Sequence, residues 1–252
     1  KDNVTNANEI FVCKVGDTGN LLWFKTYGIG VDYFTARTLH VIPQDGYYVV
    51  GELNSNAGYT SLLLFKLDTT GNILWAKEYV DTLTYIQIIG AELIATEDGF
   101  MLSGSAVRYP PGMFSHNYAY LLKTDTAGNL LWGTLVDSID YWRRGPLVTQ
   151  AGDGGYILAG QTVDPAGIHY DILFAKSDSA GNFQCRSKPF NPHVQIPLIE
   201  TTTDTPIVIS AVGTDSVASI TVTTPVQDCN WLCAGTFDIG ISQVEDTICA
   251  GD

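Results

Sequence analysis

A ten-residue phrase that occurs four times constrains the fold of this chain more than any other feature of its sequence. The copies read KVGDTGNLLW, KLDTTGNILW, KTDTAGNLLW and KSDSAGNFQC, and their Gly-Asn pairs begin at Gly19, Gly71, Gly128 and Gly181. Successive copies are therefore 52, 57 and 53 residues apart. Periods of this length are typical of propeller and solenoid proteins, in which each repeat is one supersecondary unit. The first copy departs slightly, because its aspartate stands one place later, at Asp17.

A second phrase lies between copies of the first and has the same period. It reads DGYYVVG, DGFMLSG and, with one more glycine, DGGYILAG, and it ends at Gly51, Gly104 and Gly160. Two different phrases that share one period indicate a repeated structural unit rather than a chance similarity.

The pattern of each repeat predicts β-strands. Apolar and β-branched runs alternate with Gly, Asp, Asn and Pro, as strands alternate with turns. The repeat that contains the third phrase gives four runs, IQIIGAELIAT, GFMLSGSAV, YAYLLKTD and NLLWGTLV. Four strands in roughly 50 residues match one blade of a β-propeller. The Asp-x-x-Gly-Asn phrase is expected to form the hairpin between the last two strands, and Asp-Gly the turn between the first two.

The predicted fold is therefore an all-β propeller of four-stranded antiparallel blades, with three complete units, a partial blade and a β-rich C-terminal extension. Most propellers have four to eight blades. Two interpretations stay open: the extension completes a blade with its strands HVQIPLIET, PIVISAV and VASITVTT, or further blades precede the chain. The predicted boundaries are 1–188 for the blades (a partial blade at 9–30 and units at 31–80, 81–137 and 138–188), 189–233 for the Thr- and Val-rich extension, and 234–252 for a linker and the start of a following module.

The tryptophan that ends three of the phrases is expected to hold the blades together. Large aromatic side chains at equivalent positions of successive blades pack one blade on the next. A role in stacking on a ligand would require them to be exposed together on one rim. The sequence therefore predicts that Trp23, Trp75 and Trp132 dock neighbouring blades.

The combination K-x-D-x-x-G-N-x-x-W with D-G-G-Y-x-x-x-G resembles the propeller repeats of large secreted and cell-surface proteins of Bacteroidota. Such proteins are commonly exported by the type IX secretion route. The motifs cover about residues 9–188, and the last segment, VEDTICAGD, resembles the opening of an Ig-like or PKD-like module. The resemblance implies an extracellular or cell-surface location, an adhesin-like role and a chain that is a fragment of a longer polypeptide.

The resemblance also bears on the five cysteines. In similar proteins the final repeat ends in Gly-Asn-x-x-Cys, and a second cysteine follows a Thr-, Pro- and Val-rich stretch. This implies a disulfide between Cys185 and either Cys229 or Cys233, which suits an oxidising location. An odd number of cysteines leaves one over. Cys13, in the run FVCKV, is expected to behave as a small buried hydrophobic residue.

Seven Asp-Ser/Thr triplets resemble the O-glycosylation acceptor motif of Bacteroidota. Asp-Thr and Asp-Ser are also ordinary turn residues, and because hairpin tips are exposed the two interpretations are compatible. The predicted acceptors are Thr69, Thr82, Thr126, Ser138, Ser179, Ser216 and Thr247.

The charge balance limits the possible partners. Lys and Arg number 13 and Asp and Glu 27, which gives a formal charge of −14. Nucleic acid and anionic membrane surfaces attract clustered positive charge, so neither is an expected partner. No apolar run reaches the eighteen or so residues that a membrane-spanning helix needs.

The sequence marks no catalytic, cofactor or metal site. The most metal-like pair is His169 with Asp171, and a solvated rim position is the simpler interpretation of it. The Asp-x-x-Gly-Asn-x-x-Trp phrase is similar to the Asp-box of sialidase-type propellers and to the repeat of quinone-cofactor propellers, where it is a fold element. No cofactor is therefore expected. None of the remaining histidines stands two or four residues from another His, Cys or Asp in a metal-ligand pattern; they are His40, His116 and His193.

Three functions are compatible with these features. The first is a non-catalytic structural or adhesive module of a larger surface protein, with other modules or neighbouring subunits as partners and with surface filaments as one setting. The second is a lectin-like propeller that stacks sugars on rim tyrosines such as Tyr59, Tyr109 and Tyr118. The third is an enzyme whose site in the central channel carries no sequence signature.

Overall fold

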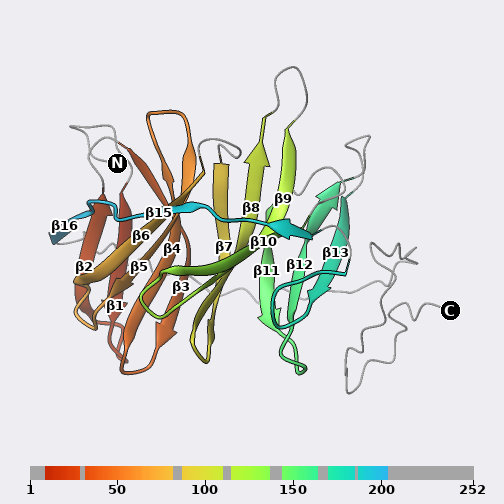
Figure 1. Ribbon diagram of the computed structural model, residues 1–252. Coiled ribbons are helices and arrows are strands. Elements are labelled where there is room, and N and C mark those ends of the chain that lie inside the picture. Colours follow the sequence, from red (N-terminus) through yellow and green to blue (C-terminus); the bar gives the residue numbers. More distant parts are fainter. Residues whose placement is uncertain are drawn as a thin grey trace. The chain divides into compact units, whose positions relative to one another are not determined.

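The chain is all-β in the part that the structure describes, as predicted. The described residues form sixteen β-strands and no helix, so they include no helix able to cross a membrane (Figure 1). Contacts divide the chain into two units, residues 1–205 and 206–252, and only the first contains described residues. The computed structural model describes residues 9–28, 32–81, 87–109, 115–136, 144–163, 170–184 and 187–203.

The second copy of the repeat, called repeat 2 here, folds as a four-stranded antiparallel meander. Each of its strands pairs with the next one along the chain. The turn between the first two strands contains the Asp-Gly phrase, and the hairpin between the last two contains Asp-x-x-Gly-Asn, as predicted. The strands are β3 (Tyr33–Ile42), β4 (Gly46–Asn54), β5 (Thr60–Leu67) and β6 (Ile73–Val80).

Repeat 3 has the same arrangement of four antiparallel strands. One parallel pair, Thr60 with Gln87, links it to repeat 2. Both complete meanders correspond to the four strands that the sequence predicts for one repeat. The strands are β7 (Gln87–Thr96), β8 (Gly99–Arg108), β9 (His116–Thr124) and β10 (Leu130–Val136).

Repeats 1 and 4 contain fewer described strands. Repeat 1 has β1 (Ile10–Val15) and β2 (Leu21–Gly28), which carry the same phrase as the last two strands of repeats 2 and 3. Repeat 4 has β11 (Arg144–Gln150), β12 (Tyr156–Val163) and β13 (Tyr170–Ser177). None of the sheets formed by described strands closes on itself.

The segment 187–203, called the crossing segment here, runs back over the outer edges of three repeats (cyan in Figure 1). It adds β14 (Ser187–Pro189) to β10, then β15 (His193–Gln195) to β6, and then β16 (Glu200–Thr203) to β2. In repeat 1 the strand order is β1-β2-β16. The run HVQIPLIET therefore lies outside the last strands of repeats 2 and 1, and it does not supply the inner strands of repeat 1.

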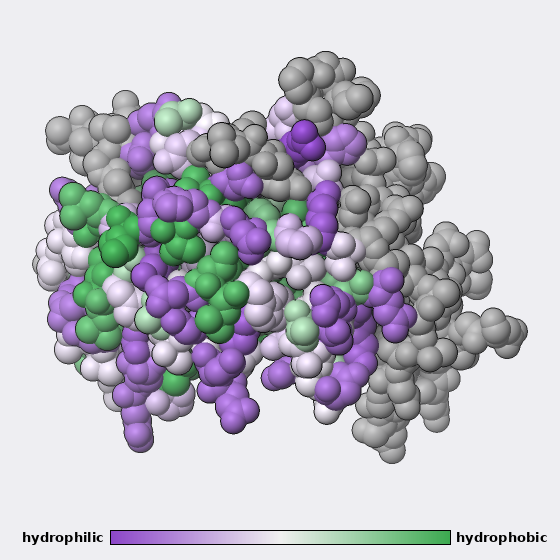
Figure 2. All heavy atoms as spheres, in the orientation of Figure 1, coloured by the Kyte–Doolittle hydropathy of each residue, from purple (hydrophilic) through white to green (hydrophobic). Residues whose placement is uncertain are grey.

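The crossing segment also exposes hydrophobic side chains between its short strands. Ile196 is 78% exposed and Leu198 is 80% exposed. Figure 2 shows hydrophobic residues gathered on the side of the view where β2, β6 and β15 lie in Figure 1. The segment is thus held by backbone pairing at the sheet edges and by the buried ring of Phe190, while Ile196 and Leu198 stay exposed.

The core lies between neighbouring repeats. In β5 the consecutive residues Leu62, Leu63, Leu64 and Phe65 are all fully buried. Side chains alternate along a strand, so Leu62 and Leu64 pack with repeat 3 while Leu63 and Phe65 pack with repeat 1. A strand covered on both faces can be continuously hydrophobic, which explains the run SLLLF.

The prediction that Cys13 is buried is wrong. Cys13 is exposed, and in β1 it alternates with the buried residues Ile10 and Val12. The run FVCKV gives no sign of this, because burial of the second face of a strand depends on whether another repeat covers it. Among the described residues no repeat covers that face of β1.

Candidate functional site

The Asp-x-x-Gly-Asn phrase builds a tight turn with an aspartate at its centre. In repeat 2 the Asp68 amide donates to the Asn72 carbonyl at 2.9 Å, and the Gly71 amide donates to the Asp68 carbonyl at 3.1 Å. The Asp68 carboxylate accepts from the amides of Thr70 and Asn72 at 2.8 and 2.9 Å. It also accepts from the Asn72 side-chain amide at 2.9 Å. Gly71 has φ +80°, which only glycine adopts without strain.

These bonds fix the charge state of the turn. The hydrogen bond from the Asn72 amide, opposed by desolvation and helped by Thr70 and by the Asn72 side chain, holds the pKa of Asp68 well below its usual range. In repeat 4 the Asn182 amide is likewise the main cause of a lowered pKa at Asp178. At Asp125 desolvation is the largest effect, but the bonds from Asn129 and Ala127 together outweigh it and lower the pKa. The aspartate carboxyl groups of all three turns are therefore ionised at neutral pH.

A tryptophan from the preceding repeat packs on each of these three turns. The Trp23 indole Nε1 on β2 donates to the Thr69 carbonyl at 3.1 Å, and a Cβ placed on Gly71 would lie 3.0 Å from the Trp23 ring. At the next junction a Cβ on Gly128 would lie 2.8 Å from the Trp75 ring, and at the third the Trp132 ring lies against Gly181. The turn glycine is thus needed twice, for its φ and for the space that the indole fills.

Two further side chains of the same strand reach the same turn. On β2 the Lys25 Nζ donates to the Asn72 Oδ1 at 2.6 Å, and the Tyr27 hydroxyl donates to the Gly71 carbonyl at 2.7 Å. Tryptophan, lysine and tyrosine stand two residues apart, so the alternation of a strand places them on one face. We call a strand that carries these three side chains a docking strand.

The second docking strand lies on β6 and repeats the geometry. The Lys77 Nζ donates to the Asn129 Oδ1 at 3.0 Å, and the Tyr79 hydroxyl donates to the Gly128 carbonyl at 2.6 Å. Burial, with a smaller contribution from Asp125, raises the pKa of Tyr79, so its hydroxyl stays a donor at physiological pH. The third docking strand is reduced, because Thr134 and Val136 replace the lysine and the tyrosine.

Sequence reasoning identified the tryptophans but missed the lysine and the tyrosine. The signal was present in WFKTY and WAKEY, two residues apart at each step. Period-two spacing after a turn is easily assigned to ordinary strand alternation. Only the packing of one repeat on the next brings these side chains to a turn that lies 44 to 52 residues further along the chain.

A second recurring contact links the two sequence phrases inside one repeat. The leading lysine of the first phrase pairs with the aspartate of the second, at 2.6 Å between Lys66 Nζ and Asp45 Oδ1 and at 2.6 Å between Lys123 Nζ and Asp98 Oδ1. The hydrogen bond from Lys66, followed by that from Tyr48, lowers the pKa of Asp45. This pairing gives the physical reason why the two phrases share one period.

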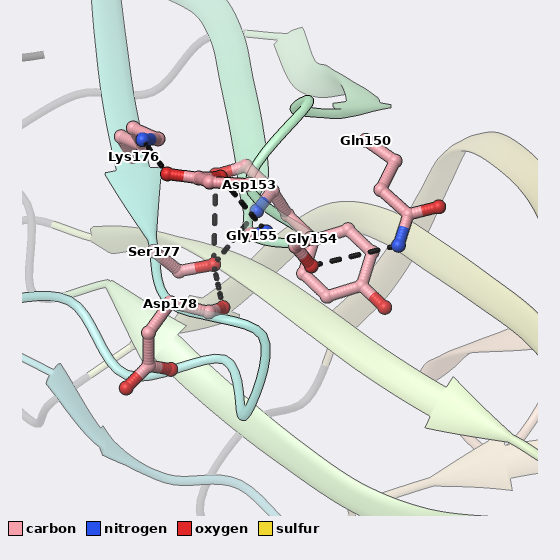
Figure 3. Close-up of polar contacts among 8 residues, drawn as sticks. Gln150, Asp153, Gly154, Gly155, Lys176, Ser177 and Asp178 are labelled. Atoms are coloured by element: carbon pink, nitrogen blue, oxygen red, sulfur yellow. Dashed lines mark hydrogen bonds and ion pairs between the residues drawn. The ribbon is translucent and has the colours of Figure 1, made fainter.

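Figure 3 shows the same pair in repeat 4, where Lys176 points at the Asp153 carboxylate. The other carboxylate oxygen of Asp153, Oδ1, accepts a hydrogen bond from the backbone amide of Gly155 at 3.1 Å. Ser177 beside it donates to the Asp178 carbonyl at 2.9 Å. The contacts of this corner all lie within the repeat, so the chemistry of the phrase serves the fold.

Two carboxylates are buried among the described residues. Glu52, 4% exposed, accepts from Arg37 Nε at 2.6 Å and from Arg37 Nη2 at 2.9 Å. Glu78, 3% exposed, accepts from the Ser61 hydroxyl at 2.6 Å and from Gln195 Nε2, on the crossing segment, at 2.7 Å. In each case both oxygens have a protein donor, as buried carboxylates require.

Three of the predicted O-glycosylation acceptors lie at equivalent turn tips. Thr69, Thr126 and Ser179 are all exposed. The remaining predicted acceptors lie outside the described residues and are Thr82, Ser138, Ser216 and Thr247. The same is true of the predicted disulfide residues Cys185, Cys229 and Cys233.

The rim tyrosines differ in their surroundings. Tyr59 and Tyr109 lie on the hairpins that join the second and third strands of repeats 2 and 3, and Tyr109 is 51% exposed. Tyr118, on β9, lies under Lys188, whose Nζ is 4.2 Å from the ring centroid. No group of three metal-ligating side chains occurs among the described residues, from which His169 is missing.

Comparison of the chain with protein-family models, with curated proteins and with solved structures gives no match.

Proposed function

We propose that this chain is a non-catalytic β-propeller module of a larger extracellular or cell-surface protein, with a structural or adhesive role such as a part of a surface filament. The observation that carries the proposal is the use of the repeat's signature residues. The aspartate, glycine, asparagine and tryptophan of the phrase, and its leading lysine, all make contacts that hold one repeat together or join it to the next. Because the repeated residues make contacts that hold the fold together, they support a scaffold role.

The surface composition supports an extracellular setting. Only 16% of the residues are charged, and the exposed turn tips carry Thr and Ser. The partners that fit this role are other modules of the same polypeptide or neighbouring subunits. Nucleic acid and inserted membrane segments do not fit a chain with a formal charge of −14.

Surface exposure on the source cells tests the proposal. Intact cells are treated with a protease, and peptides of this chain are then quantified before and after lysis. We expect the chain to be cleaved on intact cells while a cytosolic enzyme is spared. Recovery of the chain only after lysis would contradict the extracellular role.

A glycan-binding function is the second candidate, and one observation favours it. Tyr59 and Tyr109 occupy corresponding hairpins of successive repeats, where aromatic rings could stack on sugar units. A glycan array probed with the chain and with Tyr109→Ala tests it. Binding that Tyr109→Ala abolishes would support the lectin function, whereas an array without signal leaves the structural role.

A further inference from the structure

The outer face of β1 is exposed where the equivalent face of repeat 2 is buried. Phe11 is 64% exposed and Val15 is 59% exposed, and Cys13 between them is exposed as well. The residues at the same places in β5 are Leu63, Phe65 and Leu67, and each is fully buried against the preceding repeat. These three apolar side chains of repeat 1 thus lie where repeat 2 packs on its preceding repeat, but no described residues of another repeat cover them.

The turn of repeat 1 is also without its tryptophan. Among the described residues, a Cβ on Gly19 would meet nothing within 4 Å, whereas Gly71, Gly128 and Gly181 each lie against an indole. The backbone of this turn is nevertheless the same, because the Gly16 amide donates to the Asn20 carbonyl at 2.8 Å and the Gly19 amide to the Gly16 carbonyl at 2.9 Å. The turn of repeat 1 therefore has the same backbone as the other turns, and no described residue packs on it.

Lys14 shows the same incompleteness inside repeat 1. Its counterparts in repeats 2, 3 and 4 each pair with an aspartate of the Asp-Gly turn. Lys14 has no carboxylate partner among the described residues, and its Nζ lies 5.8 Å from the centroid of the Tyr47 ring. In repeats 2, 3 and 4 this aspartate lies on the Asp-Gly turn that comes earlier in the same repeat.

We propose that this face of repeat 1 binds a preceding repeat of the same kind, located on the N-terminal side of β1 in the same polypeptide and ending in a Trp-x-Lys-x-Tyr docking strand. The tryptophan fills the space over Gly19, the lysine reaches Asn20, and an inner hairpin supplies the aspartate for Lys14. The neighbouring junctions provide the template, because the same turn geometry takes these residues at Gly71 and at Gly128. The docking does not depend on the extracellular role proposed above.

A second copy of this chain is a poorer occupant. Its three tryptophan-bearing strands already dock on its own turns. The segment that follows the turn of repeat 4 has Cys185, Ser187 and Pro189 at the sequence positions of tryptophan, lysine and tyrosine, and its residues 187–189 already pair with β10 as β14. It could offer neither the indole nor the ammonium group that the turn of repeat 1 is shaped to take.

A tandem fusion tests the proposal. Residues 32–109 are duplicated in front of the full chain, so that the copy of repeat 2 supplies a docking strand and the copy of β7 and β8 supplies the inner hairpin. Residues 1–8 then join the copied β8 to β1, much as seven residues join β8 to β9 in the chain itself. The control fusion differs only by Trp75→Ala in the duplicated copy.

Cys13 is the reporter, because it lies on the face that should become covered. The rate at which N-ethylmaleimide alkylates Cys13 is followed by peptide mass spectrometry. We expect the fusion to slow alkylation at least about tenfold relative to the original chain, and the control fusion to lose most of that protection. Equal rates in the fusion and the original chain would overturn the proposal, and so would sedimentation of the original chain as a dimer with Cys13 already protected.

A pair of single variants gives an answer even if the fusion does not fold. Phe11→Ser in the original chain should leave the urea midpoint unchanged, because the face is open there. Leu63→Ser at the equivalent covered position should lower the midpoint strongly. A loss for Phe11→Ser as large as that for Leu63→Ser would mean that the face is already covered within the chain, and would refute the proposal.

Discussion

At the scale of single residues, one aspartate stabilises the hairpin turn in each of repeats 2, 3 and 4. The carboxylate of Asp68 accepts from two backbone amides and from the side chains of Thr70 and Asn72, so it replaces the water that would otherwise bind these donors. In the first copy Gly16 stands in this place, and Asp17 makes none of these bonds. The backbone turn still forms there, which indicates that Gly-Asn sets the geometry and the aspartate stabilises it.

Asp68→Ala is expected to destabilise the chain at pH 7. The carboxylate is partly exposed, so solvent screening limits the loss of unfolding free energy to about 1 kcal/mol. Asp17→Ala is the matched control and should change it by less than about 0.5 kcal/mol, as is usual for surface changes. Urea unfolding of the two variants measures both effects.

The cost of Asp68→Ala should depend on pH. The folded state lowers the pKa of Asp68, so the stabilisation is fully present above the unfolded value, about 3.9, and is lost as the pH falls toward the folded value. The difference between wild type and Asp68→Ala should therefore be constant from pH 7 to about 5 and shrink below pH 4. A difference that grows on acidification would contradict the assignment of the bonds to the carboxylate.

The turn glycine also leaves room for the indole ring. Substitutions at Gly19 and Gly181 distinguish this effect from backbone strain, because only Gly181 lies against an indole. Gly19→Ala meets only the positive φ and should cost about 1 kcal/mol of unfolding free energy. Gly181→Ala meets the same φ and the Trp132 ring, and should cost about 2–4 kcal/mol. In a Trp132→Ala background the cost of Gly181→Ala should fall to that of Gly19→Ala, which a double-mutant cycle measures. Equal costs at both glycines in the native background would argue against indole packing.

The crossing segment shows what the strands achieve as elements. Each of its short strands pairs with the edge strand of a different repeat, so one stretch of 17 residues, 187–203, covers three otherwise open edges. Open edges invite pairing with other chains, and covering them protects the sheets. The segment also supplies Gln195 as a donor to the buried carboxylate of Glu78.

Gln195→Ala tests how firmly the segment is tied to repeat 2. The substitution leaves one Glu78 oxygen without its protein donor, so the unfolding free energy should fall by about 1–3 kcal/mol. Ile196→Ala is the control, because its side chain is 78% exposed and its removal should be nearly neutral. Equally small losses for both variants would mean that the hydrogen bond from Gln195 to Glu78 adds little to the stability of the chain.

At the scale of the whole molecule, glycosylation offers a test of the extracellular role. On the native protein, peptides that contain Thr69, Thr126 and Ser179 should carry added mass in whole sugar units, because these hydroxyls are exposed at turn tips. Thr18 is the internal control: it lies on the equivalent turn after Asp17, but Gly19 follows it where the predicted motif has an apolar residue or threonine. Unmodified peptides at all three sites would leave these triplets as turn residues only.

The repeat, the strands and the turns can be predicted from the amino-acid sequence, because they depend on residues that are neighbours along the chain. The alternation in SLLLFKL, the Asp-Gly turn and the Asp-x-x-Gly-Asn hairpin all lie within a few residues of each other. Local turn chemistry and the period-two pattern act at that range. The element order and the four-stranded meander can therefore be predicted from the sequence.

Which of these residues meet across repeats depends on how the sheets pack on one another. Lys25 reaches Asn72 over 47 residues of sequence and Gln195 reaches Glu78 over 117, and no local pattern encodes either partner. The exposure of Cys13 was missed for the same reason, since β1 and β5 have similar sequences and differ in whether a repeat lies on their outer face. Burial between repeats depends on the neighbour that is present, and that is a property of the assembled sheets and not of the strand.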